Sequence, residues 1–114
     1  MSPEAFAAAA LALPGASCDL QWGADLVYKV GGKMFAVTDS AGVSLSLKVS
    51  EIAFAVLTES GRARPAPYLA RAGWVRFDDL AALDPDEVAD WLATAHGLVA
   101  AKLTRAARRE LGLA

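Results

Sequence analysis

The stretch Leu26-Val27-Tyr28-Lys29-Val30-Gly31-Gly32-Lys33-Met34-Phe35-Ala36-Val37-Thr38 decides the fold. Two runs rich in β-branched and aromatic residues flank a pair of glycines. Such a pair between two alternating runs is typical of a β-hairpin with a two-residue turn. We therefore expect segments 25–30 and 33–38 to pair as antiparallel strands across Gly31-Gly32.

The sequence that follows the hairpin continues the sheet. Asp39-Ser40-Ala41-Gly42 predicts a second turn, and Val43, Leu45 and Leu47 then alternate with Ser44, Ser46 and Lys48. This alternation indicates a strand with one buried and one wet face. Trp74-Val75-Arg76-Phe77 predicts a last short strand. Short turns between successive strands favour an antiparallel sheet.

Helical patterns occur before, between and after these strands. Ser2-Pro3-Glu4 predicts a capped helix that ends at Pro14-Gly15, and helical spacing resumes from 50 to 60, where Ile52, Phe54, Val56 and Leu57 supply the apolar side. Asp84-Pro85 opens a final helix with the apolar stripe Val88, Trp91, Leu92, Ala95, Val99 and Leu103, and Thr104 is placed to cap a short tail helix. We expect one α+β domain over residues 1–114. Its order is α-β-β-β(-β)-α-β-α, with the helices packed against the antiparallel sheet.

The composition indicates the class of protein. The chain has 114 residues, 55% of them hydrophobic, and a single cysteine, so it must form its core without an internal disulfide. No apolar run reaches the ~18 residues that a membrane-spanning helix needs. The sequence begins Met1-Ser2-Pro3-Glu4, which is acidic where a secretory signal would be basic. These features predict a cytoplasmic protein with no membrane partner.

The sequence offers no catalytic constellation. Hydrolytic enzymes need a nucleophile, a base and an orienting group, and this chain has one His, one Cys and no Asn. His96 lies beside the apolar stripe of the final helix and is interpreted as a partly buried structural residue. Cys18 follows a Pro-Gly turn and is interpreted as a small apolar filler. We expect no enzyme activity, no cofactor and no metal site.

Two basic segments are candidates for binding. The stretch from Arg62 to Arg76 holds four arginines and no acid, interleaved with Tyr68 and Trp74. Its candidate residues are Arg62, Arg64, Tyr68, Arg71, Trp74 and Arg76, which suit phosphate contacts and stacking on planar groups. The alternative is a loop whose aromatic side chains pack inward while its arginines are solvated. Lys102, Arg105 and Arg109 share one helical face and form a second candidate patch.

Several motifs in order resemble the MmcQ/YjbR family. They are Leu13-Pro14-Gly15, Trp22-Gly23, Tyr28-Lys29-Val30-Gly31-Gly32-Lys33-Met34-Phe35-Ala36, Ser46-Leu47-Lys48, Arg64-Pro65-Ala66-Pro67-Tyr68-Leu69, Gly73-Trp74-Val75 and Leu98-Val99-Ala100-Ala101-Lys102-Leu103. The resemblance implies a compact α+β fold, and its members are commonly described as DNA-binding by likeness to a double-wing arrangement. Thr104-Arg105-Ala106-Ala107-Arg108-Arg109 is less basic than the matching segment of relatives.

Three functions follow from these observations. The leading hypothesis is a non-enzymatic module that binds nucleic acid, although the net charge of −2 opposes it. The alternative is a protein-interaction module, and the third is an unrecognised small-molecule enzyme. A continuous positive stripe would favour nucleic acid, and an exposed apolar patch near Tyr68 would favour a protein. A deep pocket that holds His96 or Cys18 would favour the enzyme.

Overall fold

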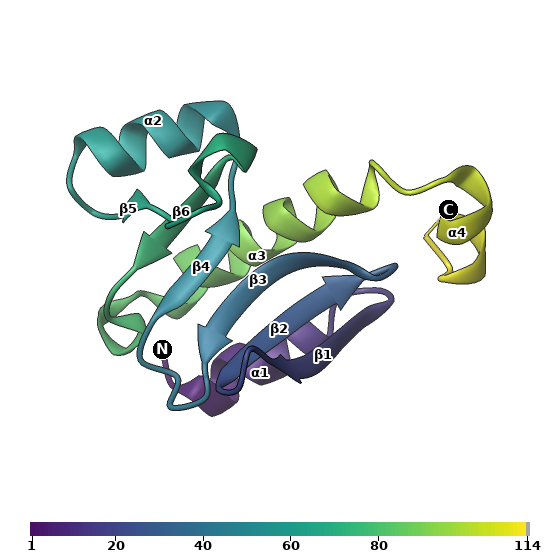
Figure 1. Cartoon of the computed structure of the whole chain (residues 1–114), viewed down its shortest axis with the longest axis horizontal. Helices are drawn as coiled ribbons and strands as arrows, with labels where there is room; N and C mark the ends of the chain where they lie inside the picture. Colours follow the sequence, from purple (N-terminus) through teal and green to yellow (C-terminus); the bar gives the residue numbers. More distant parts are fainter. Residues whose placement is uncertain (114) are drawn as a thin grey trace.

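The computed structural model describes residues 1–113 and is built around a six-stranded antiparallel sheet with strand order β1-β2-β3-β4-β6-β5 (Figure 1). The strands are β1 (Ala16–Gln21), β2 (Asp25–Val30), β3 (Lys33–Asp39), β4 (Leu45–Lys48), β5 (Arg64–Pro65) and β6 (Trp74–Phe77). The helices are α1 (Pro3–Leu11), α2 (Glu51–Glu59), α3 (Pro85–Ala100) and α4 (Arg105–Glu110), with 3₁₀ turns η1 (Ala70–Ala72) and η2 (Leu80–Ala82). The predicted α+β class is confirmed.

The predicted hairpin is present. β2 and β3 pair antiparallel across Gly31-Gly32, whose φ angles of 58° and 79° are those of a tight turn. The register shifts after Tyr28, so that β3 carries one extra residue, Phe35. Because a bulge breaks the strict alternation of side chains, Phe35 and Ala36 are both fully buried. The bulge thus adds a phenyl ring to the core.

One face of the sheet is covered by helices. Tyr28, Ala36, Leu47 and Val75 lie opposite one another on four neighbouring strands and are all buried. Helix α3 packs against β2, β3 and β4, and α1 packs against α3 and β1. Figure 1 shows α1 and α3 behind the sheet, while α2 lies beside β5 and β6. Within residues 1–113 no helix covers the opposite face of the sheet, and we call it the open face.

Each helix begins at a capping residue that the sequence contains at the expected position. Ser2 Oγ accepts a hydrogen bond from the Ala5 amide, and Ser50 Oγ accepts one from Ala53. Asp84 does the same at the start of α3, and Thr104 at the start of α4. Each cap satisfies an amide that has no partner within its helix. The four predicted helices therefore begin where expected.

Two apolar assignments were wrong. Val43 was expected inside a strand, but it is 55% exposed because the Asp39 carboxylate accepts hydrogen bonds from the Val43 and Ser44 amides and holds them in a turn. Ile52 and Val56 were expected on the packed side of α2, yet both are exposed. Helix α2 instead packs Leu57, together with Ala53 and Phe54, against the core.

The sequence predicted one strand only as optional and did not predict another. The optional strand before α2 is present as β1, an edge strand paired along its length with β2. The two-residue strand β5 falls in a segment expected to be irregular, and it pairs with β6 through Arg64–Arg76 and Pro65–Val75. Proline is tolerated there because β5 is at the edge of the sheet.

His96 is a structural residue, as the sequence indicated. It is buried, and its Nε2 lies 2.7 Å from the Pro14 carbonyl oxygen. Since a carbonyl only accepts, Nε2 carries the proton and donates it. The imidazole also meets Phe35 edge to face at 5.5 Å between ring centroids. His96 therefore ties the turn after α1 to the middle of α3.

We predict that Gly42→Ala destabilises the fold more than Gly23→Ala. Both glycines have positive φ, 70° and 81°, so each alanine costs about 1–2 kcal/mol of backbone strain. Only at Gly42 would the new Cβ also collide with the ring of Pro3, since nothing lies within 4 Å at Gly23. We expect an additional loss of about 1–3 kcal/mol in urea unfolding. Equal losses for the two variants would show that the Pro3 contact is not tight.

We also predict that His96→Leu lowers the free energy of unfolding by about 1–3 kcal/mol, because the Pro14 carbonyl loses its donor. His96→Gln keeps an N–H group at this depth and should lose less. Urea unfolding of both variants measures the difference. If leucine and glutamine are equivalent, the hydrogen bond contributes nothing to stability.

Candidate functional site

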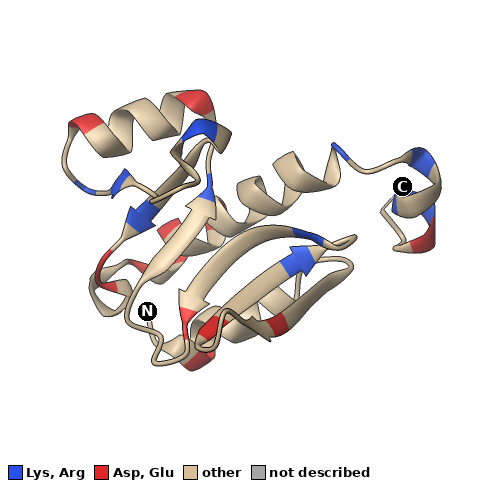
Figure 2. Ribbon diagram, in the orientation of Figure 1, with Lys and Arg blue, Asp and Glu red and all other residues tan. Residues whose placement is uncertain are grey.

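Charge is unevenly distributed over the molecule. Figure 2 shows Lys and Arg over α4, the preceding end of α3 and the nearby ends of β2 and β3, with Glu110 beside them, while the other end carries most Asp and Glu together with the Lys and Arg of β4, β5, β6 and η1. The chain has 11 Lys and Arg in all. In the part of the chain that the structure describes, four of them make ion pairs with carboxylates: Lys29, Arg62, Arg64 and Arg76.

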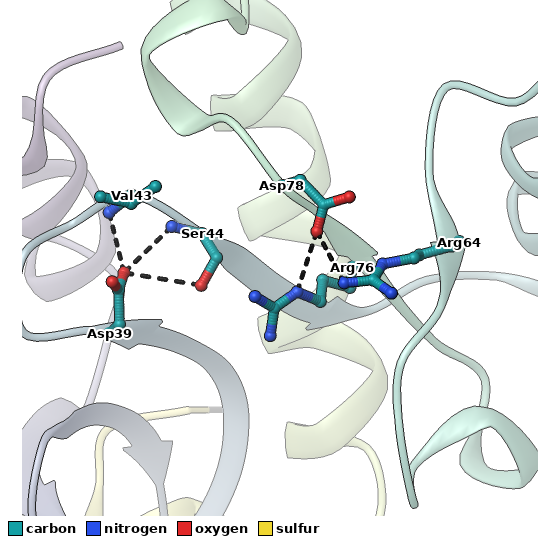
Figure 3. Close-up of polar contacts among 6 residues, drawn as sticks. All are labelled: Asp39, Val43, Ser44, Arg64, Arg76 and Asp78. Carbon is teal, nitrogen blue, oxygen red and sulfur yellow. Dashed lines mark hydrogen bonds and ion pairs between the residues drawn. The ribbon is translucent and has the colours of Figure 1, made fainter.

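The arginines of the first candidate segment are mostly paired. Arg62 donates to both oxygens of Glu87, each at 3.0 Å. Arg64 Nη2 and Arg76 Nε donate to the same oxygen of Asp78, at 2.9 and 3.1 Å (Figure 3). The acids that follow this segment in the sequence therefore fold back onto it. Three of its four arginines are already hydrogen-bonded to carboxylates.

These pairs keep the two acids ionised. Hydrogen bonds from Arg76 and then Arg64 lower the pKa of Asp78, and the hydrogen bond from Arg62 lowers that of Glu87. Such exposed pairs contribute little to stability, typically below about 1 kcal/mol. Their electrostatic effect matters more, because a phosphate would have to compete with a carboxylate for each guanidinium.

The aromatic residues of this segment differ from each other. Trp74 is 3% exposed, so the expectation that it stacks on a ligand was wrong: the indole is inside the protein. Tyr68 is fully exposed. Arg71, in η1, makes no ion pair with any residue among 1–113. Among the predicted residues of this segment, Tyr68 and Arg71 are therefore the two that are exposed and make no ion pair within residues 1–113.

The remaining cations form what we call the basic face. Its members share one property, the lack of an ion pair within residues 1–113: Lys33, Lys48, Arg71, Lys102, Arg105, Arg108 and Arg109. It contains the whole of the second candidate patch predicted from the sequence. Glu110, the acid of α4, lies among them.

The tip of the β2–β3 hairpin is packed against the segment between α3 and α4. A Cβ built on Gly31 would lie 2.7 Å from Cδ1 of Leu103. The hairpin turn, with Lys33 behind it, therefore meets the segment that carries Lys102. Glycine at position 31 allows this approach, since any side chain would collide with Leu103.

Lys48 connects the two parts of the basic face. Burial lowers the pKa of Lys48, and the nearby charge of Lys102 lowers it further. The Lys48 ammonium donates to the carbonyl oxygen of Ala72, the residue next to Arg71. The positive charge thus runs from Arg71 through Lys48 to Lys102. The sequence did not reveal this path, because β4, η1 and α3 are far apart along the chain.

Helix α4 extends the basic face. Its Leu111 packs on Gly15, where an added Cβ would lie 3.2 Å from the Leu111 Cβ. Arg105, Arg108, Arg109 and Leu113 line a shallow hollow of about 360 Å³. Three guanidinium groups around one hollow suit an anion such as a phosphate.

A second hollow lies on the open face of the sheet, and we call it the open-face cleft. It has a volume of about 440 Å³, and its lining includes Trp22, Met34, Val37, Tyr68 and Arg76. Trp22 and Tyr68 are the two non-glycine residues within 1–113 that have positive φ, 53° and 67°. This conformation costs about 1–2 kcal/mol for an ordinary residue.

Sequence reasoning did not identify Trp22 as a site residue. The available signal was a bulky residue directly before Gly23 in the turn between β1 and β2, a position where Asn or Gly is usual.

Neither Cys18 nor His96 lines the open-face cleft or the hollow at α4. Burial raises the pKa of the Cys18 thiol and raises that of its cross-strand neighbour Tyr28 to about 12, so both stay protonated at neutral pH. The Nε2 of His96 is already hydrogen-bonded to the carbonyl oxygen of Pro14. Within residues 1–113, no group of three His, Cys, Asp or Glu side chains could hold a metal ion. The helices over the same residues include none long and apolar enough to cross a membrane.

Comparison with known proteins agrees with the resemblance seen in the sequence. No curated protein matches the chain. The crystal structure of Deinococcus radiodurans protein DR2400, which carries the family-model domain DUF419, is similar, with a TM-score of 0.81 and 27% sequence identity. The match covers 94% of this chain and 85% of that one. The YjbR family model matches residues 11–98, and the chain therefore belongs to the YjbR family.

Proposed function

We propose that this protein is a non-enzymatic module that binds nucleic acid through the basic face. The observation that supports this best is the number of cations that make no ion pair. In a chain with a net charge of −2, the seven members of the basic face have no carboxylate partner within residues 1–113. Among the arginines expected to bind from the sequence, Arg62 is paired with Glu87, while Arg64 and Arg76 share the single carboxylate of Asp78.

The chemistry of the basic face suits the nucleic-acid backbone. Duplex DNA carries about one negative charge per 1.7 Å, and Lys and Arg bind by displacing condensed counterions from these phosphates. Lys102 and Arg105 belong to separate elements, so the face can follow a curved line of phosphates. Contacts to phosphates position a protein but carry no sequence information directly. We therefore expect binding that depends weakly on base sequence.

The distribution of carboxylates favours an approach at α4. Most carboxylates lie away from α4 (Figure 2), whereas Glu110 is the acid of α4 itself, so a polyanion is attracted to this end. This arrangement gives a low net charge without cancelling the local field of the basic face. It also predicts weak binding overall, since few phosphates are contacted at once.

The test is a salt titration with a 20-base-pair duplex, beginning at low ionic strength. If about four phosphates are contacted, log K should fall against log salt with a slope near −3.6, from about −0.9 per phosphate. The double substitution Lys102→Ala, Arg105→Ala should flatten the slope by about 1.8 for the same reason. Fluorescence anisotropy with two unrelated duplex sequences measures both values.

The matched control is Arg62→Ala, Arg64→Ala, which removes the same amount of charge from two ion-paired residues. It should leave the slope within about 0.5 of the parent, because neither charge faces a phosphate. Equal slopes for both double variants would place the interface elsewhere. Lack of binding to DNA and RNA at low salt would refute the proposal and favour a protein partner.

A further inference from the structure

We propose that the open-face cleft is a separate site for a small aromatic carboxylate, held by Arg76 and by the aromatic rim of Trp22 and Tyr68. The cleft of about 440 Å³ lies within the range of pockets that bind small molecules, about 300–1,000 Å³. Its floor is largely apolar and includes Met34 and Val37. Its charged lining residues are Asp25, Asp39 and Arg76, of which Arg76 is the cation. A mostly apolar lining with a few polar groups is the usual composition of such sites.

Arg76 supplies the anion-binding group. Its Nε donates to Asp78, which fixes the plane of the guanidinium. Figure 3 shows the two terminal nitrogens on the side away from Asp78. These nitrogens have no hydrogen-bond partner among residues 1–113, and Arg76 lines the cleft. A guanidinium held at one edge and free at the other can bind a carboxylate through two parallel hydrogen bonds.

The charge around Arg76 supports an anionic ligand. Arg64 and Arg76 share the single carboxylate of Asp78, so the cluster keeps one net positive charge. The carboxylates of Asp25 and Asp39 also line the cleft. They oppose a polyanion such as a nucleic-acid strand, whereas one carboxylate can lie at the Arg76 end. The ligand is therefore a small monoanion, and this site is distinct from the basic face.

The aromatic rim has no structural reason to be aromatic. Trp22 and Tyr68 belong to separate turns, and each holds the positive φ that favours Gly or Asn. The two residues are 65% and 104% exposed, so they contribute little to the core. Strained, exposed aromatic residues from two turns converge on one cleft. Strain of this kind gathers at ligand-binding sites, and a flat ring is the natural partner for aromatic side chains.

The experiment is an NMR titration of the ¹⁵N-labelled protein with indole-3-acetate and with its neutral analogue indole-3-acetamide. We expect indole-3-acetate to shift the Trp22 side-chain resonance and the amides of β3, with a Kd below about 1 mM. The amide should bind at least about tenfold more weakly, since it cannot form charge-assisted hydrogen bonds with Arg76. Equal affinities, or no shifts with 5 mM of the carboxylate (about five times the Kd ceiling), would overturn the proposal.

Single substitutions test which residues bind indole-3-acetate. Arg76→Gln should weaken indole-3-acetate about tenfold or more, while Asp78 stays paired with Arg64. Arg71→Gln removes the same charge outside the cleft and should leave the Kd unchanged. Trp22→Asn should also weaken binding, yet maintain or raise the melting temperature, because asparagine tolerates positive φ. Retained affinity in Arg76→Gln or in Trp22→Asn would refute the assignment.

A last variant separates this site from nucleic-acid binding. The substitutions Lys102→Ala and Arg105→Ala lie outside the cleft, so they should leave the affinity for indole-3-acetate unchanged. If they weaken it as much as Arg76→Gln does, the ligand binds the basic face and the open-face cleft is not its site.

Discussion

The buried row formed by Tyr28, Ala36, Leu47 and Val75 crosses four strands, and α3 packs on the side of the sheet to which this row belongs. Side chains alternate along a strand, so a slip of one residue between β4 and β6 would exchange the two faces of β6. The register therefore decides that Arg76, the neighbour of Val75, emerges on the open face. The cleft depends on this pairing as much as the core does.

Local signals made much of the fold predictable. The glycine pair at 31–32 and the caps at Ser2, Asp84 and Thr104 act within a few residues of the structure they specify. The orientation of α2 was not predictable in this way. Ile52 and Leu57 are both good core residues, and only the position of β5 and β6 decides that Leu57 is the one buried.

The candidate site was harder to predict because its ion pairs join residues that are far apart along the chain. The stretch from Arg62 to Arg76 contains no acid, yet Glu87 pairs with Arg62 from 25 residues away. The helical spacing of Lys102, Arg105 and Arg109 was visible in the sequence, since it depends on one segment. The addition of Lys48 was not, because it requires β4 to lie next to the end of α3.

Net charge is a poor guide to this protein because screening acts over a shorter distance than the molecule spans. The longest dimension is 39 Å, whereas the Debye length at physiological ionic strength is about 8 Å. Carboxylates at the far end are therefore largely screened from a phosphate at α4. The same argument keeps the two sites independent. Arg76 donates to Asp78, which is also paired with Arg64, whereas the charge of Lys102 acts on Lys48. The ion pairs that each cation makes locally, rather than the net charge of −2, decide what each surface can bind.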